Sequence, residues 1–324
     1  MTKRSLAWIT VAMTAACFAI LTVFLNGTIG QGTGNVILFA SKMMFLSVTV
    51  ASVAAFVLIF IFKRDFIRGQ AATFNRFKYL LALLVKRDFV SRYRKSVLGV
   101  LWSLLNPLLT MLVMTMVFSY LFRFQIEHYP AYLLSGLIIY NFFSEATTMG
   151  MGSVIAGEAI IKKVYVPKYI FPLSKVLSSL VNLLFSFIAF LFIYLITGVP
   201  FKATLLLFPI PMMYVFVFSL GLAMLLSSFA VFFRDLTYLY GILITLLMYL
   251  SAIFYPVDII PERFQPLMGL NPLYQFVTYF RSLVLDGTVP GLWTNTVCTG
   301  FALAALCVGV YVFMSKQDRF ILYL

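Results

Sequence analysis

The sequence predicts an all-α protein that crosses a membrane several times, and three observations predict this class. Of its 324 residues, 63% are hydrophobic and only 10% are charged, which is unlike ordinary soluble domains. Apolar runs of about 20 residues, long enough to span a bilayer as helices, recur along the chain. Lys and Arg outnumber Asp and Glu by 24 to 10 and fall mostly between these runs. We therefore expect a polytopic membrane protein without a large soluble domain.

Residues 1–65 are expected to form an N-terminal transmembrane hairpin. Two apolar runs, one ending near residue 25 and one over 36–62, flank a Gly-rich turn at 26–35. The first run follows two cations, as in a secretory signal peptide. It is long enough to span a bilayer, so we expect it to be retained as a helix.

The next segment, 66–101, is expected to lie on the cytoplasmic side. Residues 63–95 hold ten Lys or Arg against two acids, an excess that is typical of cytoplasmic loops. Val85, Phe89 and Tyr93 recur every four residues while cations gather on another side, which predicts an amphipathic helix in the membrane interface. Asp88 and Arg92, one turn apart on this helix, are expected to form an ion pair. Two roles stay open for its cations. They anchor the helix to anionic lipid, or they receive a phosphorylated lipid head group.

Residues 102–324 are expected to form a core of six spans. The candidate spans are apolar runs at about 102–122, 131–150, 170–197, 203–233, 236–254 and 293–314. Together with the hairpin they give eight crossings and place both termini in the cytoplasm. Under this topology 19 Lys or Arg lie inside, which agrees with the positive-inside rule. Four lie outside, namely Arg123, Lys202, Arg263 and Arg281.

Residues 255–285 begin and end on the outer side under this topology, so they cannot cross the membrane. Several prolines interrupt the segment, yet residues 273–285 are largely apolar. These facts predict two short re-entrant helices. Such backbone is tolerated at membrane depth only where protein or a cavity surrounds it, so we expect this segment beside a translocation path.

A short cytoplasmic helix is expected at about 152–163, between two spans. It begins at a glycine, and Pro167 limits its extension. The segment is either a plain basic loop or a surface that docks a soluble partner.

Several kinds of chemistry are absent from the sequence. No Walker-type phosphate loop occurs. The single histidine, His128, and the three cysteines show no metal-ligand spacing, so no metal or cofactor is expected in this chain. Glu145 is the one carboxylate placed clearly inside a predicted span, and an intramembrane charge costs about 2.5–3.5 kcal/mol. We therefore expect energy for transport from a separate ATPase. Topology explains the basic balance, so no nucleic-acid partner is expected.

A specific set of residues connects the basic helix to the first core span. Arg-Asp-aromatic at 87–89 is followed by Tyr93, by Ser-x-Leu-Gly-x-x-Trp at 96–102 and by Pro107. Further matching stretches lie at 161–167, 171–174, 255–256 and 270–273. Over about residues 75–324 the chain resembles the type-2 ABC exporter permeases that move polysaccharides and teichoic acids.

The resemblance implies a half-transporter that pairs with a second copy of itself and binds two ATPase subunits, which hold ATP and magnesium. It implies three groups of site residues. The gate helix for a lipid pyrophosphate comprises Arg87, Asp88, Arg92, Tyr93, Arg94, Lys95, Gly99 and Trp102. The ATPase coupling group comprises Glu158, Ile161, Lys162, Lys163, Arg234 and Asp235. The outer gate comprises Tyr255, Pro256, Pro261, Phe264, Asn271 and Pro272.

The cargo implied is an undecaprenyl-pyrophosphate-linked glycan, such as O antigen, capsule or teichoic acid, in the bacterial cytoplasmic (inner) membrane. Two other functions stay open. One is export of a small amphiphile or drug by the same superfamily. The other is a membrane-embedded polyprenyl-sugar transferase, which would need acidic or histidine catalytic groups at the interface. The N-terminal hairpin departs from the family's commoner form, and packing at the periphery of the dimer is the one role expected for it.

Overall fold

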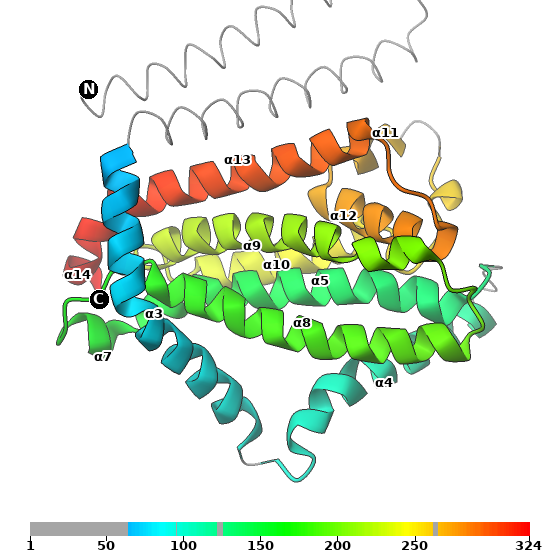
Figure 1. The fold of residues 1–324 in the computed structure, drawn as a ribbon, viewed down its shortest axis with the longest axis horizontal. Helices are drawn as coiled ribbons and strands as arrows, with labels where there is room; N and C mark the ends of the chain where they lie inside the picture. The colour runs from blue at the N-terminus through cyan, green and yellow to red at the C-terminus, as the bar shows by residue number, and fades with distance from the viewer. Residues whose placement is uncertain (1–63, 95, 122–125, 262–264) are drawn as a thin grey trace, which may run out of the picture.

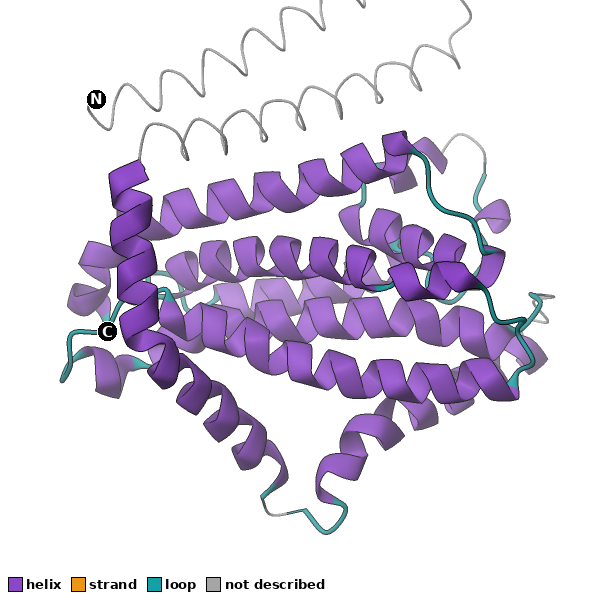
Figure 2. Ribbon diagram, viewed as in Figure 1, coloured by secondary structure: helices purple, strands orange, loops and turns teal. Residues whose placement is uncertain are grey.

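The computed structural model describes residues 64–94, 96–121, 126–261 and 265–324. Within these ranges every regular element is helical and none is a strand (Figure 2). The expected all-α class is therefore confirmed for this part of the chain. The predicted hairpin over 1–65 lies almost entirely outside the described residues.

Within the described residues and apart from α3, six helices have 15 residues or more; α4 is inclined, and the others run along the long axis of the molecule (Figure 1). They are α4 (Trp102–Met116), α5 (Tyr129–Met151), α8 (Ile170–Ile196), α9 (Pro209–Ala230), α10 (Leu236–Leu250) and α13 (Leu292–Lys316). Helix α5 packs against α4, α8, α9, α10 and α12, and 16 of its 23 residues are buried. It therefore forms the centre of the bundle.

Four helical stretches of the described chain are long and apolar enough to cross a membrane. They are Gly99–Ser119, Ile170–Ile196, Ala203–Ala230 and Leu292–Tyr323. Helix α10 is apolar but shorter, and α5 is less apolar than α8 because its neighbours, rather than lipid, enclose it. The chain is therefore a polytopic membrane protein.

Two predicted spans are less regular than expected. The run over 203–233 divides into a 3-10 turn, η3 (Ala203–Leu207), and α9. Proline is favoured in the first turn of a helix, where its missing N–H costs nothing, so Pro209 begins a new helix. The run over 102–122 forms α4 and then a π-helical turn, η2 (Val117–Leu121).

Helices α9 and α13 approach each other through small residues. A Cβ atom on Gly309 would overlap the backbone carbonyl of Gly221, and a Cβ on Gly221 would overlap the backbone of Ala305. Membrane helices associate closely through such residues because lipid supplies little hydrophobic driving force between them. These two glycines therefore set the distance between α9 and α13.

Helix α3 (Arg64–Tyr93) lies outside this bundle for most of its length. Figure 1 shows that it changes direction along its length and that its end forms a V with α4. The 3-10 turn η1 (Gly99–Leu101) leads into α4. Gly99 has a φ of +50°, a conformation that favours glycine, so it permits the turn at the apex of the V.

The expected helix over 152–163 is divided in two. Helices α6 (Ser153–Ala156) and α7 (Glu158–Ile161) meet at Gly157, where a Cβ would overlap the ring of Phe171 at the start of α8. Where the sequence predicted one helix the structure therefore has two short ones, and the residue between them is a glycine that leaves room for Phe171. Helix α14 (Phe320–Tyr323) lies at the same end of the molecule (Figure 1).

A second hydrophobic cluster joins the elements at this end. Its buried members are Leu81 and Leu84 of α3, Val154 of α6, Ile161 of α7, Val166, Ile170, Phe171, Met224, Val231, Phe313 and Phe320. We call this set the α7-end cluster. It connects α3 to the short helices and to the C-terminal helix through packed side chains.

The opposite end of the bundle carries the segment expected to be re-entrant. It forms a 3-10 turn, η4 (Val257–Ile259), then α11 (Gln265–Gly269), α12 (Pro272–Arg281) and a π-helical turn, η5 (Ser282–Asp286). Helix α12 packs against α5, α9 and α13, and six of its ten residues are buried. Because other helices enclose α12, residues 273–285 are apolar although they do not run the length of the bundle.

Candidate functional site

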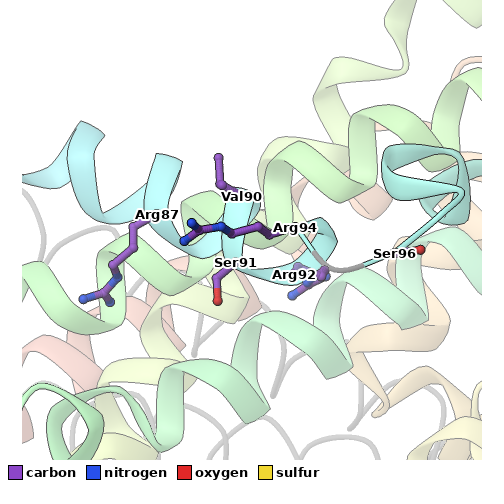
Figure 3. Close-up of a pocket in the computed structure, with 6 residues that line it drawn as sticks. All are labelled: Arg87, Val90, Ser91, Arg92, Arg94 and Ser96. Carbon is purple, nitrogen blue, oxygen red and sulfur yellow. The ribbon is translucent and has the colours of Figure 1, made fainter.

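A basic pocket of about 600 Å³ lies at the end of α3. Its lining residues are Arg87, Val90, Ser91, Arg92, Arg94 and Ser96, and we call it the arginine pocket. Figure 3 shows these side chains on the last turns of α3 and on the segment that follows. Guanidinium groups bind phosphate through paired, charge-assisted hydrogen bonds, and hydroxyl groups add donors. The lining therefore suits an anion.

Helix α3 is held against α8 by a buried ion pair. Asp88 Oδ2 lies 2.7 Å from Lys175 Nζ, and the Asp88 side chain is only 8% exposed. The contact is electrostatic, because this carboxylate oxygen makes no well-aligned hydrogen bond. Arg87 Nη2 contacts the other oxygen of Asp88 at 3.1 Å. The pair that the sequence suggested between Asp88 and Arg92, one turn apart, was wrong because both Asp88 oxygens face other cations.

Arg92 belongs to a polar network that joins four helices. Its Nη2 atom lies 2.6 Å from Glu145 Oε1 of α5, and Asn182 Nδ2 of α8 donates to the same oxygen at 2.7 Å. The hydroxyl of Tyr93 donates to Asn182 Oδ1 at 3.2 Å, and Ser103 of α4 donates to that hydroxyl at 2.6 Å. The network therefore fixes the end of α3 relative to α4, α5 and α8.

The polar network lies further along α8 than the ion pair between Asp88 and Lys175 does. Lys175 is the sixth of the 27 residues of α8, whereas Asn182 is the thirteenth and lies near the middle of the helix. Seven residues correspond to about 10 Å along a helix. The end of α3 therefore follows α8 from its first turns to its middle.

The surroundings of Arg92 keep it charged at this position. Burial lowers the pKa of the guanidinium, but the hydrogen bond and the negative charge of Glu145 outweigh burial and raise that pKa above its ordinary value. An ionisable group inside a membrane span normally has a partner and a function. This explains why the one carboxylate inside a predicted span faces an arginine.

An apolar groove of about 550 Å³ lies between α3 and α8. Its lining residues are Lys78, Leu81, Ala82, Val85, Lys86, Phe89, Leu177, Leu180 and Val181. Aliphatic side chains make up most of this lining, and two lysines lie among them. The groove therefore suits a hydrocarbon chain whose head group is negatively charged.

The remaining gate-helix residues play structural parts in the V formed by α3 and α4. Gly99 makes the turn, and its N–H donates to Ser96 Oγ at 3.2 Å. Trp102 is the first residue of α4 and is partly exposed. Lys95 lies outside the described residues.

The expected coupling residues differ in their exposure. Glu158 and Lys162 form an exposed ion pair of 2.6 Å on α7, and Lys163 is also exposed. Ile161 points inward and is buried in the α7-end cluster. Tyr165, which the sequence analysis did not select, has a side chain that is 93% exposed. Residues 162–165 therefore form an exposed projection beyond α7.

The other two coupling residues lie apart in the sequence from this projection. Arg234 and Asp235 occupy the turn between α9 and α10, and both are exposed. Asp235 immediately precedes the first residue of α10, where a negative charge interacts favourably with the helix dipole.

The expected outer-gate residues shape the segment between α10 and α12. The hydroxyl of Tyr255 donates to the carbonyl of Tyr249 at 2.6 Å, and Pro256 precedes η4. Asn271 Oδ1 accepts the N–H of Leu273 at 3.0 Å and so caps α12, which begins at Pro272. Pro261 is exposed. Phe264 lies outside the described part of the chain.

Arg281, which the sequence analysis counted only as an outer charge, is buried beneath this segment. Its guanidinium donates to the carbonyls of Ala252 and Ile253, both at 2.9 Å, and to the carbonyl of Tyr132 at 3.2 Å. Its Cζ atom lies 3.5 Å from the centre of the Tyr132 ring. Arg281 therefore joins α12 to α5 and to the end of α10.

Sequence reasoning missed the partners that complete these sites, namely Ser103, Lys175, Asn182 and Arg281. A signal existed for two of them, because Lys175 and Asn182 are polar residues inside an apolar run. Within the described ranges no group of three or more His, Cys, Asp or Glu side chains is placed to hold a metal ion.

The membrane-crossing bundle, its basic pocket and its enclosed end helix define a helical membrane transport protein rather than a soluble enzyme. Residues 79–285 match the family model of the ABC-2 type transporter, and the chain belongs to this family. The match begins within α3, so it includes the arginine pocket, and it ends at η5.

Several curated relatives are similar to this chain. The O-antigen export system permease protein RfbA of Klebsiella pneumoniae is 33% identical over 245 residues, which cover 74% of this chain and 93% of the relative. RfbA of Myxococcus xanthus is 27% identical over 247 residues, 76% and 95% of the two chains. The polysialic acid transport protein KpsM of Escherichia coli is 22% identical over 244 residues, 74% and 95% of the two chains.

Proposed function

We propose that this chain is the permease subunit of an ATP-driven exporter that moves a lipid-linked cell-surface polysaccharide across the bacterial cytoplasmic membrane. Relatives named for O-antigen export, polysialic acid transport and capsule polysaccharide export support the class of cargo. The observation that carries the proposal is the arginine pocket, which places three guanidinium groups at the end of α3.

The pocket and the groove supply the two kinds of contact that a lipid pyrophosphate needs. Arg87, Arg92 and Arg94 meet the phosphate oxygens through charge-assisted hydrogen bonds. The apolar groove between α3 and α8 takes the first part of the polyprenyl chain. Asp88 is a positioning residue in this scheme, because its ion pair with Lys175 keeps α3 against α8.

A separate ATPase supplies the energy, because the sequence contains no Walker-type loop for ATP. The exposed projection at 162–165 is the proposed docking surface, together with Arg234 and Asp235. Ile161 of α7 packs in the same hydrophobic cluster as Leu81 and Leu84 of α3. A displacement of α7 by the ATPase is therefore transmitted to α3, which carries the arginine pocket, through packed side chains. ATP and magnesium bind to the partner, not to this chain.

Two copies of the chain form the transport path with two ATPase subunits. Helices α4 and α10 carry many exposed apolar side chains, which suit contact with a second copy or with lipid. The α7 end faces the cytoplasm with both termini, and α11 and α12 close the outer side as re-entrant gate helices. The core then comprises the six spans α4, α5, α8, α9, α10 and α13.

The exporter reconstituted with its ATPase in proteoliposomes tests this function. An undecaprenyl-pyrophosphate-linked oligosaccharide should stimulate ATP hydrolysis by the wild type. The double variant Arg92→Gln with Arg94→Gln should raise the lipid concentration needed for half-maximal stimulation by at least about a hundredfold, since two charge-assisted hydrogen bonds of about 1.5–3 kcal/mol each are lost. The complex should still assemble. Arg76→Gln on the exposed part of α3 is the matched control and should respond like the wild type.

Three outcomes contradict the proposal. Equal stimulation of the wild type and the double variant would remove the role of the arginine pocket. Transfer of sugar by the permease without its ATPase would favour the membrane-embedded transferase. Stimulation by small amphiphiles but not by the glycan lipid would favour the drug exporter.

A further inference from the structure

Residues 317–324, which we call the C-terminal segment, lie at the α7 end of the bundle (Figure 1). After α13 they form a 3-10 turn, η6 (Gln317–Arg319), and then α14. Phe320 is fully buried in the α7-end cluster, whereas Leu322, two positions on, is 81% exposed. A helix of one turn is not stable by itself, so the buried ring of Phe320 anchors the segment to the bundle.

The C-terminal segment is bound to the connection between α7 and α8. Lys168 Nζ donates to the carbonyl of Gln317 at 2.6 Å. The same ammonium group lies 5.9 Å from the centre of the Phe320 ring, which is attractive for a cation. Lys168 is three positions after the exposed projection at 162–165. The segment therefore holds the base of that projection.

The same segment is bound to the turn between α9 and α10. The ring of Phe232 meets the rings of Phe320 and Tyr323 edge to face, with centroids 6.0 and 4.7 Å apart. Aromatic pairs prefer this arrangement because the positive edge of one ring meets the negative face of the other. Phe232 is two positions before Arg234. The segment therefore also holds the turn that carries Arg234 and Asp235.

Phe320 shares its surroundings with both connections. Val166, between α7 and α8, and Val231, between α9 and α10, are buried in the same cluster as this ring. Truncation of a buried aromatic side chain leaves a cavity that its neighbours fill only in part. Loss of the Phe320 ring would therefore loosen both connections together.

We infer that the C-terminal segment is a positioning element, which holds the two parts of the ATPase docking surface in one fixed arrangement. This inference rests on the proposed function, which assigns the projection at 162–165 and the pair at 234–235 to that surface. A surface that is already ordered in the free protein is bound more tightly, because little conformational freedom is lost on association. The segment continues α13, so a displacement of the docking surface also reaches that helix through packed side chains.

The test measures binding of the purified ATPase subunit to the full-length permease in nanodiscs, at a temperature well below unfolding. If Phe320→Ala holds the two parts together about one-tenth of the time, its apparent affinity for the ATPase falls about tenfold. Phe320→Leu keeps an apolar side chain in the cluster and should recover most of the affinity. The melting temperature of each permease variant, measured without the ATPase, verifies that it is folded during the binding measurement.

Two exposed residues of α14 supply matched variants. Tyr323→Ala removes the contact with Phe232 but little other packing, because Tyr323 is 56% exposed. It should weaken ATPase binding by a smaller factor than Phe320→Ala, and it decides the matter if Phe320→Ala does not fold. Leu322→Ala is the control and should bind the ATPase like the wild type.

The outcomes separate this inference from the proposed function. Wild-type affinity in both Phe320→Ala and Tyr323→Ala would overturn the inference and leave the C-terminal segment with a stabilising role only. A loss in Leu322→Ala as large as that in Phe320→Ala would also overturn it, because the segment would then contact the ATPase itself.

A wild-type permease that does not bind the ATPase would instead contradict the proposed function. Unchanged binding after Lys163→Glu with Tyr165→Ala would contradict the docking surface assigned there. Weaker binding by Phe320→Ala that Phe320→Leu recovers, with Leu322→Ala unaffected, supports the inference.

Discussion

Replacement of Arg281 by methionine tests how the end of the bundle that carries α12 is held together. Methionine keeps much of the side-chain volume but donates no hydrogen bond. The carbonyls of Tyr132, Ala252 and Ile253, now 3.2, 2.9 and 2.9 Å from guanidinium nitrogens, would lose their donors. The ring of Tyr132 would also lose a cation 3.5 Å from its centre.

The magnitude follows from two opposing contributions. Each buried polar group left without a partner costs about 1–3 kcal/mol. The methionine variant also avoids the desolvation cost of burying a guanidinium, which offsets part of this loss. Removing one partner of a buried charged pair nevertheless costs about 3–5 kcal/mol in typical cases. We expect Arg281→Met to lower the free energy of unfolding by about 3 kcal/mol. At about 2–4 °C per kcal/mol, this lowers the apparent melting temperature by about 6 °C or more.

The assay is thermal unfolding of the detergent-solubilised protein, followed by limited proteolysis of residues 255–291. Arg281→Lys should recover only part of the stability, because one ammonium group cannot reach carbonyls on both α5 and the end of α10. Arg234→Met, at an exposed turn, is the matched control and should have the same melting temperature as the wild type. The reasoning would be refuted if Arg281→Met had the melting temperature of the wild type and were cleaved by the protease at the same rate.

Two further substitutions test helix packing. Gly309→Ala should lower the free energy of unfolding by about 2 kcal/mol, because its Cβ would overlap the carbonyl of Gly221. Gly241→Ala is the control in the same melting assay. Open space surrounds this position, so the substitution should be neutral or slightly stabilising. Equal melting of the two variants would contradict this packing. Asp88→Asn should destabilise the docking of α3 by about 3 kcal/mol and expose α3 to trypsin, and adding Lys175→Met should restore protection. Failure of that rescue would show that the ion pair does not hold α3.

Much of the helical framework was predictable because hydrophobicity and helix boundaries are local properties. The run expected at 170–197 is α8 to within one residue, and the run expected at 131–150 is α5 to within two. Asn271 followed by Pro272 marks the start of α12, as capping chemistry requires. The close packing of Gly157 against Phe171, between the two short helices found at 153–161, was not predictable because Phe171 belongs to a different element.

The arginine pocket was predictable as a basic helix but not as a site. Its cations appear in the sequence as one amphipathic pattern, and the pattern does not show which of them are already paired. Asp88 pairs with a lysine of α8 and Arg92 pairs with a glutamate of α5, and both partners are far away in the sequence. These partners become visible only when the positions of α5 and α8 beside α3 are known. The sequence alone therefore suggested a pair between Asp88 and Arg92 that does not form.

The amino-acid sequence by itself determined that this protein is a bundle of membrane-crossing helices with a basic segment before its core. Apolar runs and the distribution of Lys and Arg suffice for that, since the bilayer acts on each segment separately. Only the tertiary structure decided that the end of α3 lies along α8, that Glu145 pairs with Arg92 and that Arg281 is buried at the end of the bundle that carries α12. Ion pairs and hydrogen bonds act over a few ångströms, so they depend on which helices pack together.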